Sequence, residues 1–139
     1  MNKETAIKTA AKWWADKLRG GNPDIKGADT PTDDQLAVFT AELESMIPKF
    51  MDVFDILHDD IHHPTGTVVT MDCQFKPCAV LSKAAGKAGI DPFNFPFKEY
   101  TCIRKNGTND YRFWVASGEP FKDGTGQMVQ PCKEVEPYE

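Results

Sequence analysis

Apolar residues recur every three or four positions along the first part of the chain, and this spacing predicts amphipathic helices. A first helix is predicted for residues 3–19, with one buried stripe made of Ile7, Ala11, Trp14 and Leu18. Trp13 lies about 100° around the helix axis from Trp14. One of the two indole rings is therefore expected to anchor the core, and the other to lie at its margin.

A second apolar stripe begins after Thr32–Gln35, which has the pattern of a capping box. It keeps its helical phase through Pro48, and its members are Leu36, Phe39, Leu43, Ile47, Phe50, Phe54, Leu57 and Ile61. A proline inside a helix removes a hydrogen bond and costs about 3 kcal/mol. We therefore expect a kink or a break near Ile47, and the preserved phase favours a kinked pair of segments that share one buried stripe.

The apolar period changes after the turn at Thr65–Gly66. Residues 67–73 are rich in β-branched side chains, which predicts a short strand. Pro77 suits the first turn of a helix, and Gly89 is a typical helix end. A strand followed by a helix with a face of small residues is predicted for this middle region.

The clearest local signal is a β-hairpin around Asn106–Gly107, the dipeptide most typical of a two-residue turn. Its strands are predicted at residues 99–104 and 109–116, with Lys105 paired with Thr108. This register places on the core face Tyr100, Cys102, Tyr111, Phe113 and Val115. It places on the opposite face Thr101, Ile103, Arg112 and Trp114.

Together these elements predict a single α+β domain over residues 1–139. N-terminal helices, one of them long and kinked, are expected to pack on a small, mainly antiparallel sheet built around the hairpin. Residues 133–139 are predicted to form a frayed tail. The even spacing of the second stripe also allows burial against a second subunit, so a homo-oligomer is one alternative.

The composition is that of an ordinary globular protein, with 40% hydrophobic and 27% charged residues. No apolar run approaches the roughly 20 residues that cross a bilayer, and the N-terminus lacks the apolar segment of a signal peptide. The four cysteines are irregularly spaced without a C-x-x-C motif, which favours free thiols in a reducing compartment. We therefore predict a cytoplasmic protein without a membrane partner.

The net charge of −5 is unevenly distributed along the chain. Between residues 33 and 60, Lys49 is the one base among eight acids, which are Asp33, Asp34, Glu42, Glu44, Asp52, Asp55, Asp59 and Asp60. Such a segment argues against direct nucleic-acid binding. It can dock on a basic partner, imitate DNA or keep the protein soluble, and a solvated helix face is the simplest interpretation.

Two clusters have residue types that occur in functional sites. His58 and His62 are four residues apart, within metal-binding reach on a helix, but a polar helix end is the simpler interpretation and no metal is predicted. Asp72 ends the predicted strand, and Cys78 lies in the first turn of the next helix, where a thiol pKa can be lowered. The alternative is that Asp72 caps the turn and Cys78 packs inward.

Aromatic and basic residues form the set that we expect to contact a ligand or a partner. Aromatic rings offer stacking surfaces, and Lys or Arg offers contacts to an anion, a combination suited to nucleotides and to protein hot spots. With Asp72 added, the predicted binding residues are Trp13, Trp14, Asp72, Phe97, Lys98, Arg112 and Trp114. The alternative is that the rings serve only in packing.

The sequence contains no serine-hydrolase, zinc-protease, phosphate-loop or dinucleotide-binding motif. This favours a binding protein that needs no cofactor over an enzyme. Two alternatives are an enzyme that uses Asp72 or the His58 and His62 pair, with or without a metal, and a structural or assembly protein of a virion.

The segment Ala11–Arg19, with its Trp-Trp pair, resembles the N-terminus of small uncharacterised proteins encoded by bacterial phages and prophages. The resemblance continues through a strand at Val68–Asp72, a helix at Pro77–Ile90 and the connector Phe95–Lys98. It implies a phage accessory protein that acts in the host cytoplasm. Small acidic proteins of that origin often inhibit host defence, so the implied partner is a host protein or a sequestered nucleotide-like ligand.

Overall fold

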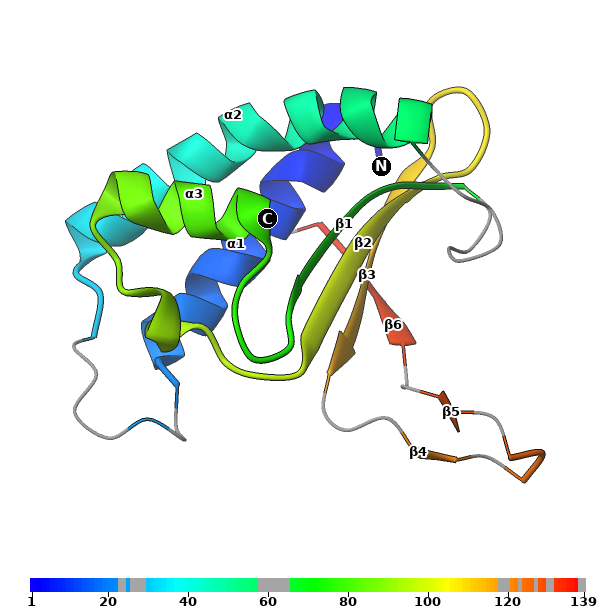
Figure 1. The fold of residues 1–139 in the computed structure, drawn as a ribbon. Coiled ribbons are helices and arrows are strands. Elements are labelled where there is room, and N and C mark those ends of the chain that lie inside the picture. Colours follow the sequence, from blue (N-terminus) through cyan, green and yellow to red (C-terminus); the bar gives the residue numbers. More distant parts are fainter. Residues whose placement is uncertain are drawn as a thin grey trace.

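Three helices pack against one face of an antiparallel sheet, as Figure 1 shows. This computed structural model describes residues 1–22, 25, 30–57, 66–117, 121–122, 124–126, 128–129 and 132–137. The helices are α1 (Lys3–Gly20), α2 (Asp33–Leu57) and α3 (Ala79–Ala88), and the 3-10 turn η1 (Pro92–Asn94) follows α3. The arrangement confirms the predicted α+β class.

The main sheet has four strands in the spatial order β1-β2-β3-β6, and every neighbouring pair is antiparallel. These strands are β1 (Thr67–Cys73), β2 (Glu99–Lys105), β3 (Tyr111–Ser117) and β6 (Cys132–Val135). A separate two-stranded ladder is formed by β4 (Phe121–Lys122) and β5 (Met128–Val129).

Strand β6 corrects the prediction for the end of the chain. It pairs Val135 with Phe113 and Cys132 with Ala116. A frayed tail is therefore wrong for residues 133–135. The physical reason is that the edge of β3 offers unpaired backbone groups, and an added strand satisfies them whatever its own side chains are.

Helix α1 carries both neighbouring tryptophans into the core. Asn2 caps it, since the Asn2 side chain accepts a hydrogen bond from the Thr5 N–H at 2.8 Å. Trp14 is fully buried and Trp13 is 8% exposed, and their rings meet edge to face with centroids 4.9 Å apart. The Lys17 ammonium lies 5.0 Å from the centre of the Trp13 ring. Both indole rings therefore belong to the core, and the expected position of one of them at the margin is wrong, because Trp13 also packs on Phe113 of the sheet.

Helix α2 continues without interruption through Pro48. The capping box is confirmed, because Gln35 N–H donates to Thr32 Oγ1 at 3.1 Å and Thr32 N–H donates to Gln35 Oε1 at 2.9 Å. Its buried stripe includes Leu36, Phe39, Leu43, Ile47 and Met51. The alternative of a break near Ile47 is wrong. Each buried side chain of this size contributes about 1.5–3 kcal/mol, which together offsets the roughly 3 kcal/mol cost of the proline.

The β2–β3 hairpin has a longer turn than the Asn106–Gly107 dipeptide predicts. Lys105 pairs with Tyr111, so residues 106–110 form the connection. The loop is closed by the Asn106 N–H, which donates to the Asp110 carbonyl at 2.7 Å. The predicted register, with Lys105 opposite Thr108, is therefore wrong by three positions.

Side chains alternate between the two faces of a sheet, so a register error of three positions exchanges the predicted faces of one of the two strands. The prediction was correct for β3, whose residues Tyr111, Phe113 and Val115 face the helices, and wrong for β2. The core face of the hairpin consists of Thr101, Ile103, Tyr111, Phe113 and Val115. Tyr100 and Cys102 consequently lie on the face that points away from the helices.

The orientation of β2 is explained by a buried chain of hydrogen bonds that joins α1, β2 and β1. The Trp14 indole Nε1–H donates to Thr101 Oγ1 at 3.0 Å. The Thr101 hydroxyl in turn donates to the Met71 carbonyl at 2.8 Å. Thr101 is fully buried, and it satisfies the indole N–H that α1 brings into the core.

We predict that Thr101→Val destabilises the protein by about 1–3 kcal/mol, because it leaves the buried Trp14 indole N–H without an acceptor at nearly unchanged volume. Urea unfolding followed by circular dichroism measures the difference. Thr70→Val, on the half-exposed face of β1, is the matched control and should change the free energy of unfolding little. Equal losses in the two variants would contradict a special role for Thr101.

Candidate functional site

The predicted binding residues divide between the two faces of the sheet. Trp13 and Trp14 lie in the core on the helix side. Asp72, Arg112 and Trp114 lie on strands and point to the opposite side, as the pairing registers show. The structure therefore does not bring the predicted set into one cradle.

Phe97 and Lys98 lie in the connector before β2. Phe97 is half-buried against the core, and its ring centroid is 6.2 Å from that of Phe75. Lys98 has a positive φ of 63°, and its N–H donates to the Gln74 carbonyl at 3.2 Å. These contacts shape the loop between β1 and α3, and they give both residues a structural role.

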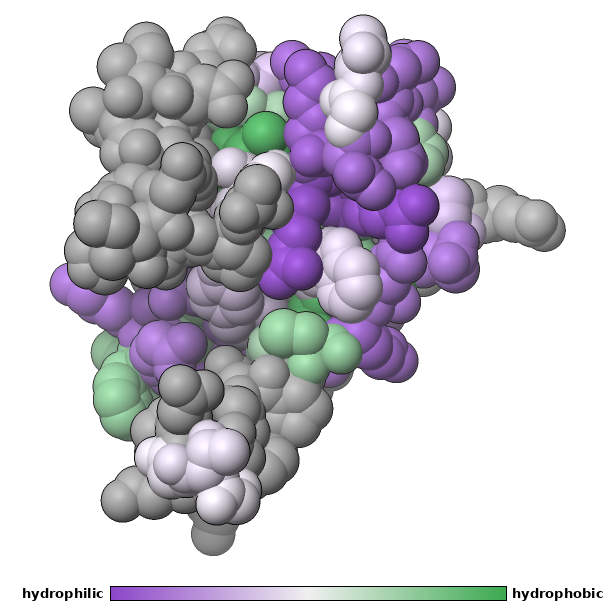
Figure 2. All heavy atoms as spheres, turned by 90° about the vertical axis from the view of Figure 1, so that its right-hand side faces the viewer, coloured by the Kyte–Doolittle hydropathy of each residue, from purple (hydrophilic) through white to green (hydrophobic). Residues whose placement is uncertain are grey.

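We call the face of the sheet that points away from the helices the outer face. By the strand registers it carries Thr70, Asp72, Tyr100, Cys102, Arg104, Arg112, Trp114, Ala116, Cys132 and Glu134. No helix of the described ranges packs against it. Figure 2 shows the side of the molecule that lies to the right in Figure 1, with hydrophilic side chains gathered in its upper right part and paler ones among them.

Arg104 and Trp114 form the centre of the outer face. The Arg104 guanidinium carbon lies 5.0 Å from the centre of the Trp114 ring, a cation–π contact. Cys102, directly opposite Trp114 on β2, is only 1% exposed. The Arg104 Nε is buried and has no hydrogen-bond acceptor. An unsatisfied buried donor costs about 1–3 kcal/mol, and the cation–π contact with Trp114 offsets part of this cost.

Arg112 is directly opposite Arg104 in the β2–β3 register. Its guanidinium is 3.3 Å from Asp110 Oδ2 and 3.7 Å from Glu134 Oε2. These two carboxylates hold Arg112 in position, whereas no ion pair joins Arg104 to a carboxylate of the described residues. Like charges placed directly opposite each other weaken a strand pair. The carboxylates beside Arg112 offset this repulsion at one of the two arginines.

Asp72 and Tyr100 are cross-strand partners on the same face. Burial raises the pKa of Asp72, and a hydrogen bond from Gln74 opposes this shift. Burial is also the main cause that raises the pKa of Tyr100 to about 12. Both groups are half-buried and lie on the part of the outer face that leads to the loop after β1.

Cys73, Cys78 and Cys102 are free thiols in the structure, as predicted. Cys78 lies at the N-terminus of α3, and its N–H donates to the Asp72 carbonyl at 2.9 Å. Burial raises the pKa of Cys78, and burial together with the nearby Asp72 raises the pKa of Cys73 to about 11. The idea of a lowered thiol pKa at Cys78 is therefore wrong, and the inward-packing alternative is supported.

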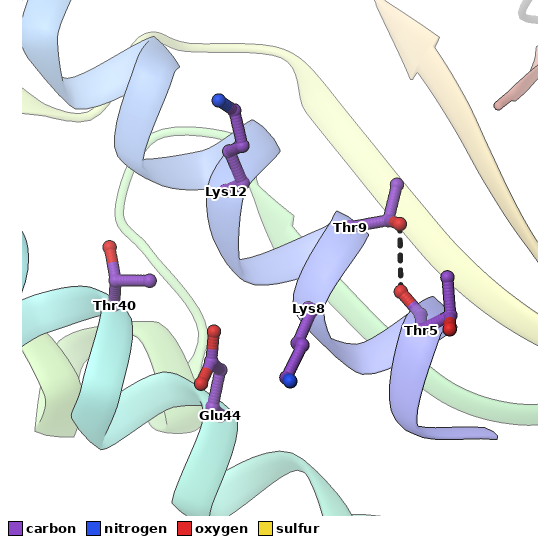
Figure 3. Close-up of a pocket in the computed structure, with 6 residues that line it drawn as sticks. All are labelled: Thr5, Lys8, Thr9, Lys12, Thr40 and Glu44. Atoms are coloured by element: carbon purple, nitrogen blue, oxygen red, sulfur yellow. Dashed lines mark hydrogen bonds between the residues drawn. The ribbon is translucent and has the colours of Figure 1, made fainter. Parts of the chain in front are cut away.

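A groove between α1 and α2 is the other surface feature that could bind a ligand. This groove has a volume of about 390 Å³. Its lining includes Lys8 and Lys12 on α1 and Thr40 and Glu44 on α2, as Figure 3 shows. The Lys8 ammonium pairs with Glu4 at 3.1 Å. The lining carries charges of both signs on exposed, flexible side chains, and this arrangement selects no particular ligand.

The acidic segment is less uniform in space than in sequence. Asp33 at the start of α2 is bound by Arg19 of α1 at 2.6 Å. Glu44 lies in the groove beside the lysines of α1 (Figure 3). The helix therefore presents partly neutralised acids. Asp59, Asp60 and the His58 and His62 pair lie outside the described residues.

Sequence reasoning missed Arg104 and Tyr100 because the predicted hairpin register placed the residues of β2 on the wrong faces. The useful signal is the alternation of β2 itself: once Thr101 is assigned inward, Tyr100, Cys102 and Arg104 must all point outward. Arg112 and Trp114 were found because the register error did not affect β3.

Comparison with protein-family models, curated protein sequences and solved structures gives no match. Among the described residues, no helix has the length and apolar character needed to span a membrane. The same part of the chain holds no cluster of three or more His, Cys, Asp or Glu side chains suited to a metal ion. The outer face is therefore interpreted from its own chemistry.

We predict that Asp72→Asn stabilises the protein at neutral pH. The pKa of Asp72 is raised in the folded state above its ordinary value of 3.8, so the ionised carboxylate opposes folding. The stability gain of the variant should shrink as the pH falls through the folded pKa, and vanish below 3.8. Urea unfolding of both proteins across this range tests it. A stability gain that does not depend on pH would contradict its attribution to the ionised Asp72 carboxylate.

Proposed function

We propose that this chain is a non-catalytic accessory protein of phage type that inhibits a host factor, and that it does so by binding a host protein on its outer face. The observation that carries the proposal is the composition of that face, where Trp114, Tyr100, Arg104 and Arg112 lie together on two neighbouring strands. Trp, Tyr and Arg are the residues most enriched in the hot spots of protein interfaces.

The shape of the face supports a protein partner more than a small ligand. Small-molecule sites are concave and enclose most of the ligand surface. The outer face is instead one side of an antiparallel sheet, with its residues spread over four strands. One face of the Trp114 ring is already covered by the Arg104 guanidinium, which limits the stacking surface left for a nucleotide base.

The outer face also fits better than the acidic helix. Docking of α2 on a basic partner depends on its exposed carboxylates, and one of them, that of Asp33, is paired with Arg19 at 2.6 Å. A surface salt bridge of this kind must be broken before the acid can contact a partner. We therefore place the binding surface on the sheet.

The host-inhibitor part of the proposal rests on the resemblance of the Trp-Trp helix to phage-encoded proteins. A host defence factor in the bacterial cytoplasm is the partner class that this origin suggests. The alternatives are an enzyme that uses Asp72 or the His58 and His62 pair, and a structural or assembly protein of a virion. The binding experiment separates them from the proposal.

We predict that Trp114→Ala removes a partner protein that the wild-type chain retains from a bacterial lysate, because the variant loses the largest aromatic side chain of the outer face. The melting temperature should fall by only a few degrees, since Trp114 is half-exposed and lies outside the main core. Affinity purification with quantitative mass spectrometry measures retention, and thermal unfolding measures stability.

The matched control is Val38→Ala, which removes an apolar side chain that is 44% exposed on α2. It should retain the partner at the wild-type level. Loss of the partner in both variants, or in neither, would contradict the proposal. Native mass spectrometry of untagged protein adds a second test, because a retained small molecule in place of a protein would favour nucleotide sequestration.

A further inference from the structure

The strand registers place three polar donors in one row across β1, β2 and β3. Arg104 on β2 is directly paired with Arg112 on β3, so both residues point to the outer face. Thr67 on β1 is paired with Arg104 beside a β-bulge, where the register shifts between Thr67 and Val69. The row is held tightly at its β1 end, where the Lys105 N–H donates to the Gly66 carbonyl at 2.7 Å.

Two atoms of this row are buried donors without an acceptor. Thr67 is only 3% exposed and its Oγ1 has no hydrogen-bond partner, and the Arg104 Nε is in the same condition. Most buried polar groups in proteins are satisfied, so two unsatisfied atoms on paired residues are unusual. Beside them lies the Arg112 guanidinium, 44% exposed and reachable from solvent.

We propose that Thr67, Arg104 and Arg112 form a binding site for a carboxylate, supplied by an Asp or Glu side chain of the partner protein. The proposal deepens the proposed function, since it names the chemistry that the partner presents to the outer face. A carboxylate accepts several hydrogen bonds at once, and it neutralises the repulsion between the two guanidinium groups.

A carboxylate fits the local charge better than a phosphate does. Arg104 and Arg112 contribute two positive charges, and Asp110 and Glu134 beside Arg112 contribute two negative ones. A carboxylate adds one negative charge to these surroundings, whereas a phosphate group adds nearly two, so the carboxylate meets less repulsion from Asp110 and Glu134. Because the Arg104 Nε is buried, the incoming group contacts Arg112 first and reaches Arg104 after a shift of its side chain.

The test is an NMR titration of the free protein with N-acetylglutamate α-amide, a probe with one side-chain carboxylate. Inorganic phosphate and sodium chloride at matched ionic strength are the parallel arms. We expect saturable shifts of the Arg104 Nε–H and Trp114 indole N–H signals with the carboxylate probe. In Arg104→Gln, the same Trp114 shift should require a probe concentration at least about tenfold higher, because the variant loses a charge-assisted hydrogen bond.

Arg19→Gln is the matched control, because Arg19 is an exposed arginine on α1 that pairs with Asp33. It should bind the probe as the wild type does. Thermal unfolding of each variant checks that the fold is intact, and Arg104→Lys, which keeps the charge but loses the planar fork, should also bind weakly.

Shifts that are not saturable, or that persist in Arg104→Gln, would overturn the carboxylate site. Tighter binding of phosphate than of the carboxylate probe would overturn the choice of ligand. The outcome is separate from that of the proposed function. If the chain binds the probe but the Trp114→Ala variant retains the partner, the carboxylate site stands and the proposed interface is wrong. If the chain does not bind the probe but Trp114→Ala loses the partner, the interface stands and the carboxylate site is wrong.

Discussion

The hydrogen-bond chain from Trp14 through Thr101 to Met71 is the interaction on which the rest of the structure depends. Burying an indole N–H without an acceptor is costly. The Thr101 hydroxyl supplies the acceptor and itself donates to the Met71 carbonyl on β1. Once Thr101 points inward, the alternation of β2 directs Tyr100, Cys102 and Arg104 outward. A single buried contact in the core therefore decides what the outer face presents to a partner.

The two faces of the sheet follow different physical rules. On the core face the Trp14 indole and the Thr101 hydroxyl are hydrogen-bonded. Phe113, Ile103 and Met71 are fully buried against the helices. The outer face instead sets two arginines opposite each other and leaves buried donors on Thr67 and Arg104 without acceptors. Sites that sacrifice stability in this way are commonly sites of binding, where the partner supplies the missing interactions.

The helices and strands could be predicted from the sequence because their signals are local and periodic. The stripe of α2, the capping box at Thr32 and the approximate hairpin positions all depend on residues close together in the chain. The register of the hairpin could not be predicted, because the Asn106–Gly107 turn signal competes with the contact between Trp14 and Thr101, 87 residues apart. The sequence predicted Arg112 and Trp114 as residues of the candidate site. It did not predict Arg104, because the position of Arg104 on the outer face depends on that register.

The most direct test of the account is site-specific photo-crosslinking in bacterial cells. A photoreactive amino acid replaces either Thr70, half-exposed on the outer face, or Ala41, exposed on α2. The account predicts a discrete crosslinked protein species from position 70 and none from position 41. Crosslinking from position 41 alone would contradict it, and would move the binding surface from the sheet to the helices.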